Sequence, residues 1–332
     1  MKTISLVIIN YNGRRFLERL FATIRAQTFQ DFEVIFVDND SKDDSVDYVE
    51  KNYAEAKIIR SQNLGYGTGC NIGAKNAAGK YLAFLNEDMY LPENFLEKII
   101  AFRDLLPKQE KIGAVSCKMI DFDADPADFP PTLGGNIDLF GFPVKNKNPE
   151  DIFIVSGSPF LIKRDLFEKI GGYNEMIFIY GEDVDLSWRL KLMSRDNFVN
   201  NGTYIHHFAG GATGNFGPQK IANIVYGAFI SIFTNYNIFT FVIILPFFLI
   251  CGLLFYLLLT IIKFDISYVY EIMRKKIYFL KNFKKALKIR EFVQKERVKS
   301  DFYILRYISL IPAFFLNNPL AKLGKNFSAK NT

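Results

Sequence analysis

Three short polar segments each follow an apolar run and carry side chains that could bind a charged ligand. They are Asn10-Tyr11-Asn12, Asp38-Asn39-Asp40 and Asn86-Glu87-Asp88. An aromatic ring beside amides and a carboxylate suits a nucleobase, which can stack on the ring and hydrogen-bond to the polar groups. Asp88 suits a divalent cation that bridges phosphate oxygens, because hard cations prefer carboxylate ligands. Each segment alone is ordinary turn chemistry, so its significance depends on whether the fold brings all three together.

The densest acidic cluster, Glu182, Asp183 and Asp185, precedes the only tryptophan, Trp188. At a predicted helix start these carboxylates would be stabilised by the helix dipole, which is a sufficient structural explanation. A carboxylate in a partly apolar pocket can also take a proton from a hydroxyl nucleophile. Both interpretations stay open on the residues alone. Arg189, one turn after Asp185, is expected to pair with it.

The only two histidines, His206 and His207, are adjacent and precede a glycine-rich turn. A buried histidine is more often structural, but neutral imidazole beside carboxylates is a common ligand for Mn²⁺-like metals. The glycines between residues 65 and 69 have the wrong spacing for a dinucleotide-binding fingerprint. The sequence contains no Walker A pattern.

Alternating strands and helices in the first half of the chain would position these groups. Near-continuous apolar runs predict buried strands, and apolar residues at helical spacing predict the helices between them. This alternation indicates an α/β fold with a mostly parallel sheet covered on both faces, which binds ligands at the carboxyl ends of its strands. Residues 120–150 have little periodicity and are expected to form a long functional loop. The predicted strands cover 4–9, 34–37, 58–59, 81–85 and 153–162, and the predicted helices 16–24, 41–53, 70–78, 92–105, 164–170 and one from about 182.

Composition excludes several classes of protein. The 332 residues include 34 Phe and 17 Tyr, which excludes a mainly disordered chain. Three widely spaced cysteines exclude a disulfide scaffold and a cysteine-based zinc site, and they suit a reducing compartment. The net charge of +6 is uneven, because residues 263–332 carry an excess of 11 positive charges and residues 1–262 an excess of 5 negative charges. The protein is therefore predicted to have an acidic body and a basic tail.

Residues 238–262 form a run of 25 residues without charge, longer than the roughly 20 needed to cross a bilayer. The basic stretch that follows keeps apolar residues at helical spacing and is predicted to lie on an anionic membrane surface, with a solvated charged helix as the alternative. The first apolar run is too short for a signal peptide, and the tail is basic; both features favour the cytosol for the two ends of the chain. The apolar run at 238–262 is therefore expected to form a re-entrant or interfacial hairpin, interrupted at Pro246 and Gly252, or two spans. The predicted division is a catalytic domain at 1–218, a membrane-inserting segment at 219–262 and a membrane-surface region at 263–332.

Over residues 3–215 the chain resembles the family 2 glycosyltransferases of the GT-A fold, in the rhamnosyltransferase-like subgroup that builds bacterial surface polysaccharides. The number, order and spacing of several motifs together carry this resemblance. These motifs are Val7 to Gly13, Val37-Asp38-Asn39 with Ser41 and Ser45, Asn63 to Gly67 with Asn71-Ile72-Gly73, Phe84 to Asp88, Gly171 to Glu175, Glu182 to Leu186 with Arg189, and His206-His207.

The resemblance implies roles for particular residues. It implies nucleotide contacts from Asn10, Tyr11 and Asn12, with Asp38 reading the base. It places Asn39, Gly65, Asn71 and Asn86 in the nucleotide-sugar site as well. Asn86-Glu87-Asp88 matches the metal-binding Asp-X-Asp of the family with Asn in first place, so Asp88 carries most of the binding of a Mn²⁺ or Mg²⁺ ion. His207 matches a third metal ligand, with His206 as the alternative. Asp183 is placed as the catalytic base, Glu182 as its acidic neighbour, and Asn174 as a structural replacement for an Asp.

The function implied is inverting transfer of a sugar, rhamnose or another hexose, from a nucleotide-diphosphate sugar to a hydroxyl of a lipid-linked or saccharide acceptor. The implied location is the cytoplasmic face of the cell membrane. Two alternatives remain. One is a glycosyltransferase that acts on a polyprenyl phosphate, and the other is a membrane-tethered sugar-nucleotide-binding protein without activity. A nucleic-acid partner is not expected, because the aromatic residues of the basic tail follow helical spacing and flank apolar segments.

Overall fold

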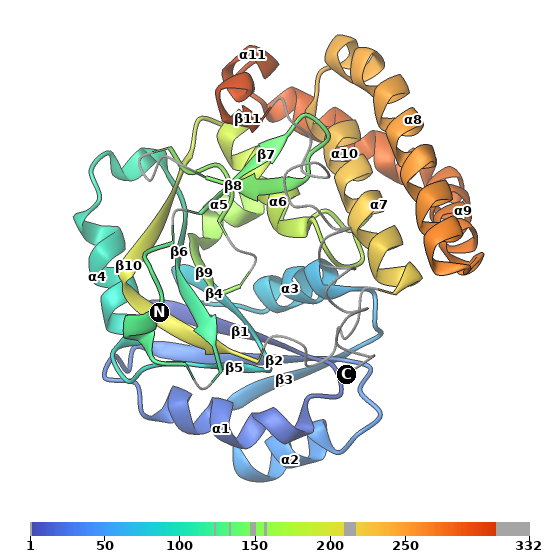
Figure 1. The fold of residues 1–332 in the computed structure, drawn as a ribbon. Coiled ribbons are helices and arrows are strands. Elements are labelled where there is room, and N and C mark those ends of the chain that lie inside the picture. Colours follow the sequence, from blue (N-terminus) through green and yellow to red (C-terminus); the bar gives the residue numbers. More distant parts are fainter. Residues whose placement is uncertain are drawn as a thin grey trace.

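The computed structural model describes residues 2–122, 124–132, 134–146, 151–155, 158–208 and 217–309. In this part of the chain, eight strands form one sheet in the order β3-β2-β1-β4-β9-β6-β10-β5, and three short strands form a second sheet in the order β11-β7-β8 (Figure 1). The large sheet contains β1 (Ile4–Asn10), β2 (Phe32–Asn39), β3 (Ala56–Ser61), β4 (Tyr81–Asn86), β5 (Met89–Tyr90), β6 (Ile112–Asp121), β9 (Phe160–Lys163) and β10 (Asp196–His207). The small sheet contains β7 (Gly135–Asp138), β8 (Pro143–Lys145) and β11 (Ile308–Ser309).

Helices cover both faces of the large sheet, as the alternation of patterns predicts. Strand β1 is buried along its whole length because its alternate side chains enter two different cores. Ile4, Leu6 and Ile8 pack with α1 (Arg14–Arg25), α2 (Ser45–Asn52) and α4 (Phe95–Leu105). Val7 and Ile9 pack on the other face with α3 (Tyr66–Lys75), α5 (Arg164–Lys169) and α6 (Glu182–Leu192). The mostly parallel α/β fold is confirmed.

The neighbouring strands β3, β2, β1 and β4 are parallel and end at one edge of the sheet. In this register Asn10 lies opposite Asp38, and Ile9 lies opposite Asn86. The three polar segments that follow β1, β2 and β4 therefore share an edge, as expected from the strand pattern.

The structure contains two long strands that the sequence patterns do not predict, β6 and β10. They pair in parallel, with a register shift between Asn200 and Tyr204 that accommodates Asn201-Gly202-Thr203, a sequence more typical of a turn. The predicted strand at 153–162 is shorter, since β9 covers only Phe160–Lys163, and it runs antiparallel to β4 and β6. Part of the predicted long loop forms β7 and β8, which pair with each other.

The last third of the described chain is helical. It contains α7 (Pro218–Asn235), α8 (Ile238–Lys263), α9 (Ser267–Lys281), α10 (Phe283–Glu296) and α11 (Asp301–Ile304), which a short 3-10 turn at Leu305–Tyr307 follows. Two more 3-10 turns, at Gln109–Lys111 and Pro126–Asp128, lie in the sheet domain. Helix α7 packs against α6 and also against α8, α9 and α10, so it lies between the sheet domain and the remaining helices (Figure 1). Helix α7 begins at Pro218, and the predicted division of the chain at residue 218 stays a prediction.

Helix α8 is long and apolar enough to cross a membrane, and only 22% of an 18-residue apolar stretch within it is buried in the protein. It is the one helix with these properties among the residues that the structure describes. Its 26 residues correspond to a length of about 39 Å. The helix continues through Pro246 without a break, so the hairpin expected at Pro246 and Gly252 is not what forms. A proline removes one backbone hydrogen bond from a helix, and the other backbone hydrogen bonds on either side of it can still form, so the helix can continue.

Candidate active site

The ends of β1 and β2 are joined by side-chain hydrogen bonds. The Nδ2 atom of Asn10 donates to Oδ1 of Asp38 over 2.9 Å and lies 3.0 Å from Oγ of Ser41. The backbone N–H of Ser41 donates to the other oxygen of Asp38 over 3.0 Å. Asn10 and Asp38 are both buried, so these contacts hold the Asp38 carboxylate in one orientation at the sheet edge.

The loop after β1 presents an accessible aromatic ring beside this pair. Asn12 has a φ of +54°, a left-handed conformation that asparagine tolerates, and its N–H donates to Oγ of Ser41 over 2.9 Å. Its Oδ1 accepts from the N–H of Lys42 over 2.7 Å. Tyr11 is 41% exposed, so its ring face is available for stacking. Ser41 links both segments, since its hydroxyl contacts Asn10 and Asn12 and its N–H donates to Asp38. Its place in the motif Val37-Asp38-Asn39 with Ser41 is the signal that could have identified it as a site residue.

Strand β5 brings Asp88 to the same histidine that the family resemblance favours. Met89 pairs with His207 in the antiparallel ladder between β5 and β10. As a result, Oδ1 of Asp88 lies 3.3 Å from Nε2 of His207. His206 instead has its Nδ1 3.4 Å from the carbonyl oxygen of Asp121. The structure therefore brings Asp88 together with His207 rather than with His206.

Asp88 and His207 fit a divalent cation as two of its ligands. Oδ1 of Asp88 is buried, and nothing in the described ranges donates a hydrogen bond to it. Two atoms 3.3 Å apart can both bind one cation at about 2.1 Å. The described residues contain no group of three or more His, Cys, Asp or Glu side chains that could hold a metal. A cation at Asp88 would therefore take further oxygen ligands from water or from a bound phosphate.

Two other residues of this segment carry unusual polar groups. Burial, followed by the nearby charge of Asp88, raises the pKa of Glu87 to about 8, so this carboxyl is largely protonated at neutral pH. The backbone N–H of Tyr11 donates to Glu87, which ties the segment to the loop after β1. Oδ1 of Asn86 is buried and has no hydrogen-bond partner among the residues that are described.

The glycine-rich segment before α3 is packed tightly against the chain that leads to α6. Gly65 has a φ of +100°, and a Cβ atom there would lie 2.3 Å from the carbonyl oxygen of Phe178, so only glycine fits. Asn71 binds Tyr173 through both of its amide atoms, at 2.9 Å to the carbonyl oxygen and 2.8 Å to the N–H. Asn39 lies buried against Gly69. These contacts fix α3 against the chain that leads to α6, and direct ligand contacts from Gly65, Asn71 and Asn39 stay a prediction.

Helix α6 presents two adjacent carboxyl groups in different environments. Gly181 precedes the helix with a φ of +94°. Glu182 is buried, and burial followed by the charge of Asp183 raises the pKa of Glu182 to about 8. Glu182 is therefore largely protonated at neutral pH. Asp183 is partly exposed, and its Oδ1 accepts a hydrogen bond from the N–H of Val184 over 2.8 Å.

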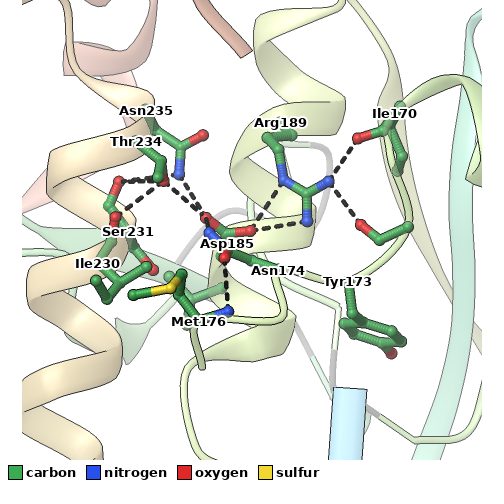
Figure 2. Close-up of polar contacts among 12 residues, drawn as sticks. Ile170, Tyr173, Asn174, Met176, Asp185, Arg189, Ile230, Ser231, Thr234 and Asn235 are labelled. Carbon is green, nitrogen blue, oxygen red and sulfur yellow. Dashed lines mark hydrogen bonds and ion pairs between the residues drawn. The ribbon is translucent and has the colours of Figure 1, made fainter. Parts of the chain in front are cut away.

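Asp185, in the same turn, is fully buried, and Figure 2 shows it between Arg189 and the side chains of α7. The expected pair with Arg189 is confirmed, with Arg189 Nη2 2.7 Å and Nε 2.9 Å from Oδ2 of Asp185. Arg189 also donates to the carbonyl oxygens of Ile170 and Gly172 over 2.6 Å each. Asn174 donates to Oδ1 of Asp185 over 3.4 Å and accepts from the N–H of Met176 over 3.1 Å, in keeping with its expected structural role. This cluster fixes α6 to the loop before it.

Comparison with curated proteins identifies relatives over the sheet domain. Residues 5–171 match the family model described as Glycosyl transferase family 2. An uncharacterized glycosyltransferase of Rickettsia typhi is 28% identical over 198 residues, 58% of this chain and 59% of the relative. An N-acetylglucosaminyl-diphospho-decaprenol L-rhamnosyltransferase of Mycobacterium tuberculosis is 25% identical over 234 residues, 61% of this chain and 75% of the relative. The chain thus spans little more than half the length of the Rickettsia relative.

Solved structures share the fold. TarS of S. aureus, residues 1–349, superimposes with a TM-score of 0.52 at 18% identity, over 71% of this chain and 66% of that structure. GalNAc-T7, solved with UDP, GalNAc and Mn²⁺, superimposes with a TM-score of 0.56 at 17% identity, over 69% and 48% respectively. At these identities the likeness shows the GT-A fold alone. The match to the family model over half of its length shows that the chain belongs to glycosyltransferase family 2.

Proposed function

We propose that this glycosyltransferase moves a sugar, with inversion, from a nucleoside diphosphate donor to a hydroxyl group of its acceptor. The observation that carries the proposal is the presence of two polar pairs at one edge of the large sheet, one where β1 and β2 end and one where β10 ends. The Asn10–Asp38 pair beside Tyr11 suits the nucleoside, and the Asp88–His207 pair suits a cation next to the diphosphate. Both pairs lie at the carboxyl edge, where parallel sheets bind ligands.

Asp183 is the group proposed as the catalytic base. It lies partly exposed in the first turn of α6, whereas its neighbour Glu182 is buried and largely protonated at neutral pH. Asp183 takes the proton of the acceptor hydroxyl while the hydroxyl oxygen forms a bond to the anomeric carbon. The bond from that carbon to the diphosphate oxygen breaks in the same displacement, and the nucleoside diphosphate departs with the bonding electrons. One displacement inverts the anomeric configuration.

Asp88 and His207 are proposed to hold a Mn²⁺ or Mg²⁺ ion. When bound, such an ion stabilises the negative charge that develops on the departing diphosphate. The buried Oδ1 of Asp88, to which no described residue donates a hydrogen bond, supports this assignment. The solved structure of GalNAc-T7 contains Mn²⁺ together with UDP, which supports it as well.

Similar proteins support the proposal for the class of donor and acceptor. TarS has been solved with UDP and with UDP-GlcNAc, which supports a nucleotide-sugar donor. The Mycobacterium tuberculosis relative is named for rhamnose transfer to a diphospho-decaprenol acceptor. We propose a hexose or rhamnose donor and a lipid-linked or saccharide acceptor in the synthesis of a surface polysaccharide.

Helix α8 is proposed to attach the enzyme to the cytoplasmic face of the membrane. Its apolar side chains are mostly exposed, unlike those of a core helix, and exposed basic residues of α9 and α10 follow it in the chain. Flotation with anionic phospholipid vesicles tests this proposal. The wild-type protein should float, and Ile250→Glu with Leu254→Glu should sediment. Leu105→Glu, at an exposed apolar residue on α4, is the matched control and should float.

The proposed activity is tested by turnover of a panel of nucleotide sugars by the detergent-purified full chain. UDP-GlcNAc and dTDP-rhamnose belong in the panel, and each donor is supplied with Mn²⁺, with Mg²⁺ or with EDTA. Metal-dependent turnover of one donor supports the whole proposal. Turnover that EDTA leaves unchanged keeps the transfer and removes the metal site. Donor binding without transfer or hydrolysis would support an inactive binding protein instead.

A further inference from the structure

The buried carboxylate of Asp185 connects the helix that carries the proposed base to the last turn of α7. Its Oδ1 atom accepts from Nδ2 of Asn235 over 3.0 Å and lies 3.1 Å from Oγ1 of Thr234. Asp185 and both partners have no exposed surface. Figure 2 shows the two α7 side chains reaching the carboxylate from the side opposite Arg189. Hydrogen bonds to a buried charge are among the stronger ones in proteins, so this contact is an effective tie between the helices.

The last turn of α7 is itself fixed from its far side by α10. The side chain of Gln294 donates to the carbonyl oxygens of Thr234, Asn235 and Tyr236 over 2.9, 3.2 and 3.2 Å. Arg297 lies 3.3 Å from the carbonyl oxygen of Asn235. These are carbonyl groups at a helix end, which have no partner within the helix itself. The side chains that reach Asp185 therefore come from a firmly held turn.

A second contact presses α7 against the residues that precede the base. A Cβ atom on Gly227 would lie 2.1 Å from the carbonyl oxygen of Tyr180 and 3.5 Å from Cα of Gly181. The backbones of α7 and the start of α6 are therefore in direct contact two turns before Asn235. Helix α7 thus holds the first turn of α6 at two points, one on each side of Glu182 and Asp183.

We propose that Asn235 and Thr234 are positioning residues for catalysis, acting through Asp185 on the turn that carries Asp183. The inference rests on the proposed role of Asp183 as the base. A general base works only within hydrogen-bond reach of the proton it takes, and small displacements of reacting groups cost large factors in rate. Asp185 lies two residues after Asp183, so a shift of its carboxylate moves the same helical turn.

The test compares variants of the full chain that lose a contact with Asp185 with a variant that loses only a bond within α7. Besides Asp185, Oγ1 of Thr234 lies 2.9 Å from the carbonyl oxygen of Ile230, and Nδ2 of Asn235 donates to that of Ser231 over 2.9 Å. Asn235→Leu keeps a similar volume and removes the N–H donor, and Thr234→Val removes the hydroxyl. Thr234→Ser restores a hydroxyl. Ser231→Ala is the matched control, because Ser231 is buried on the same helix and its hydroxyl donates only to the carbonyl oxygen of Gly227. Three quantities are measured: kcat for transfer, donor Kd, and hydrogen–deuterium exchange of the amides in residues 182–188.

We expect Asn235→Leu to lower kcat by about tenfold, the effect of losing about one hydrogen bond to a charged group. Donor Kd should stay within about twofold, since the residues proposed to bind the donor, at the ends of β1, β2 and β10, are unchanged. Exchange in residues 182–188 should accelerate in Asn235→Leu and Thr234→Val but not in Ser231→Ala or Thr234→Ser. Equal kcat and equal exchange in Asn235→Leu and Ser231→Ala would overturn the inference. If the wild-type protein transfers no sugar, the proposed function fails, and the exchange comparison alone decides whether Asp185 positions the turn.

Discussion

The carboxyl edge of the sheet and the cluster around Asp185 are both polar and largely buried, but they differ in how far their hydrogen bonds are satisfied. At the sheet edge, buried oxygens of Asn10, Asn86 and Asp88 lack a hydrogen-bond partner among the described residues. The contrast holds for the carboxylate of Asp185 itself: Arg189 reaches one of its oxygens, and Asn174, Thr234 and Asn235 reach the other, although Oδ1 of Asn235 has no partner among the described residues.

This difference separates a group that supports the fold from a group that is available to a ligand. Leaving a buried polar atom without a partner costs free energy, so a protein retains such atoms where a substrate or ion completes them. A carboxylate whose partners all come from the chain has no capacity left for a substrate. Asp183 is partly exposed and is the proposed base, whereas Asp185, two residues later on α6, is fully buried, so the two are expected to respond to mutation in opposite ways.

The largest expected effect is on catalysis by Asp183→Asn. An asparagine can still accept the hydrogen bond from the N–H of Val184, but it cannot take a proton from the acceptor. Transfer should fall by about 10³-fold, the range that general-base catalysis supplies, while donor binding and the melting temperature stay unchanged. Steady-state kinetics and calorimetric donor titration check this. Substantial turnover would remove Asp183 as the base, and turnover with a polyprenyl phosphate acceptor would favour the alternative glycosyltransferase class.

The next effect is on stability, in Asp185→Ala. The change leaves the buried Arg189 without its carboxylate, and breaking a buried ion pair costs about 3 kcal/mol or more of unfolding free energy. Denaturant unfolding measures this, with Asp183→Asn as the control in the same helical turn. The double variant Asp185→Leu with Arg189→Leu removes both charges and should recover part of the loss. Equal stability of Asp185→Ala and the wild-type protein would contradict the contrast between the two carboxylates.

The sheet edge could be predicted from the sequence because its strands are short apolar runs followed at once by polar residues. Parallel strands of this kind bring Asn10, Asp38 and Asn86 to one edge whatever the details of the helices. The pair of Asp185 and Arg189 could also be predicted, since residues four apart on a helix are neighbours.

Strand β10 and the α7 contacts could not be predicted in the same way. In β10 the sequence Asn201-Gly202 indicates a turn, and only the register shift against β6 lets the strand continue to His207. Thr234 and Asn235 are about 50 residues from Asp185, and their contact depends on how α7 packs on α6. No local pattern contains that information.

A smaller effect is expected for metal binding at His207. His207→Ala removes the imidazole 3.3 Å from Asp88 and should raise the Mn²⁺ concentration for half-maximal activity by about 30-fold, within the range typical of disrupted metal sites. His206→Ala should raise it less, because His206 lies beside the carbonyl oxygen of Asp121. Manganese titration of activity distinguishes the two variants. A larger effect of His206→Ala would reverse the assignment.

The smallest expected effect is on the pH dependence of stability and concerns Glu87, next to Asp88 at the sheet edge. Its pKa is about 8 in the folded protein and near 4.3 in an unfolded chain, so the folded state binds more protons between these values. The contribution of Glu87 to the free energy of unfolding is therefore full below about pH 4 and is lost as the pH rises through about 8. Glutamine is neutral throughout, so Glu87→Gln should lose a few degrees less in melting temperature than the wild-type protein between about pH 5 and about pH 9. Calorimetry at both pH values measures the difference, and Glu50→Gln, on exposed α2, should keep the wild-type slope. If the melting temperature of Glu87→Gln fell with pH as steeply as that of the wild-type protein, burial would not hold the Glu87 carboxyl in its protonated form.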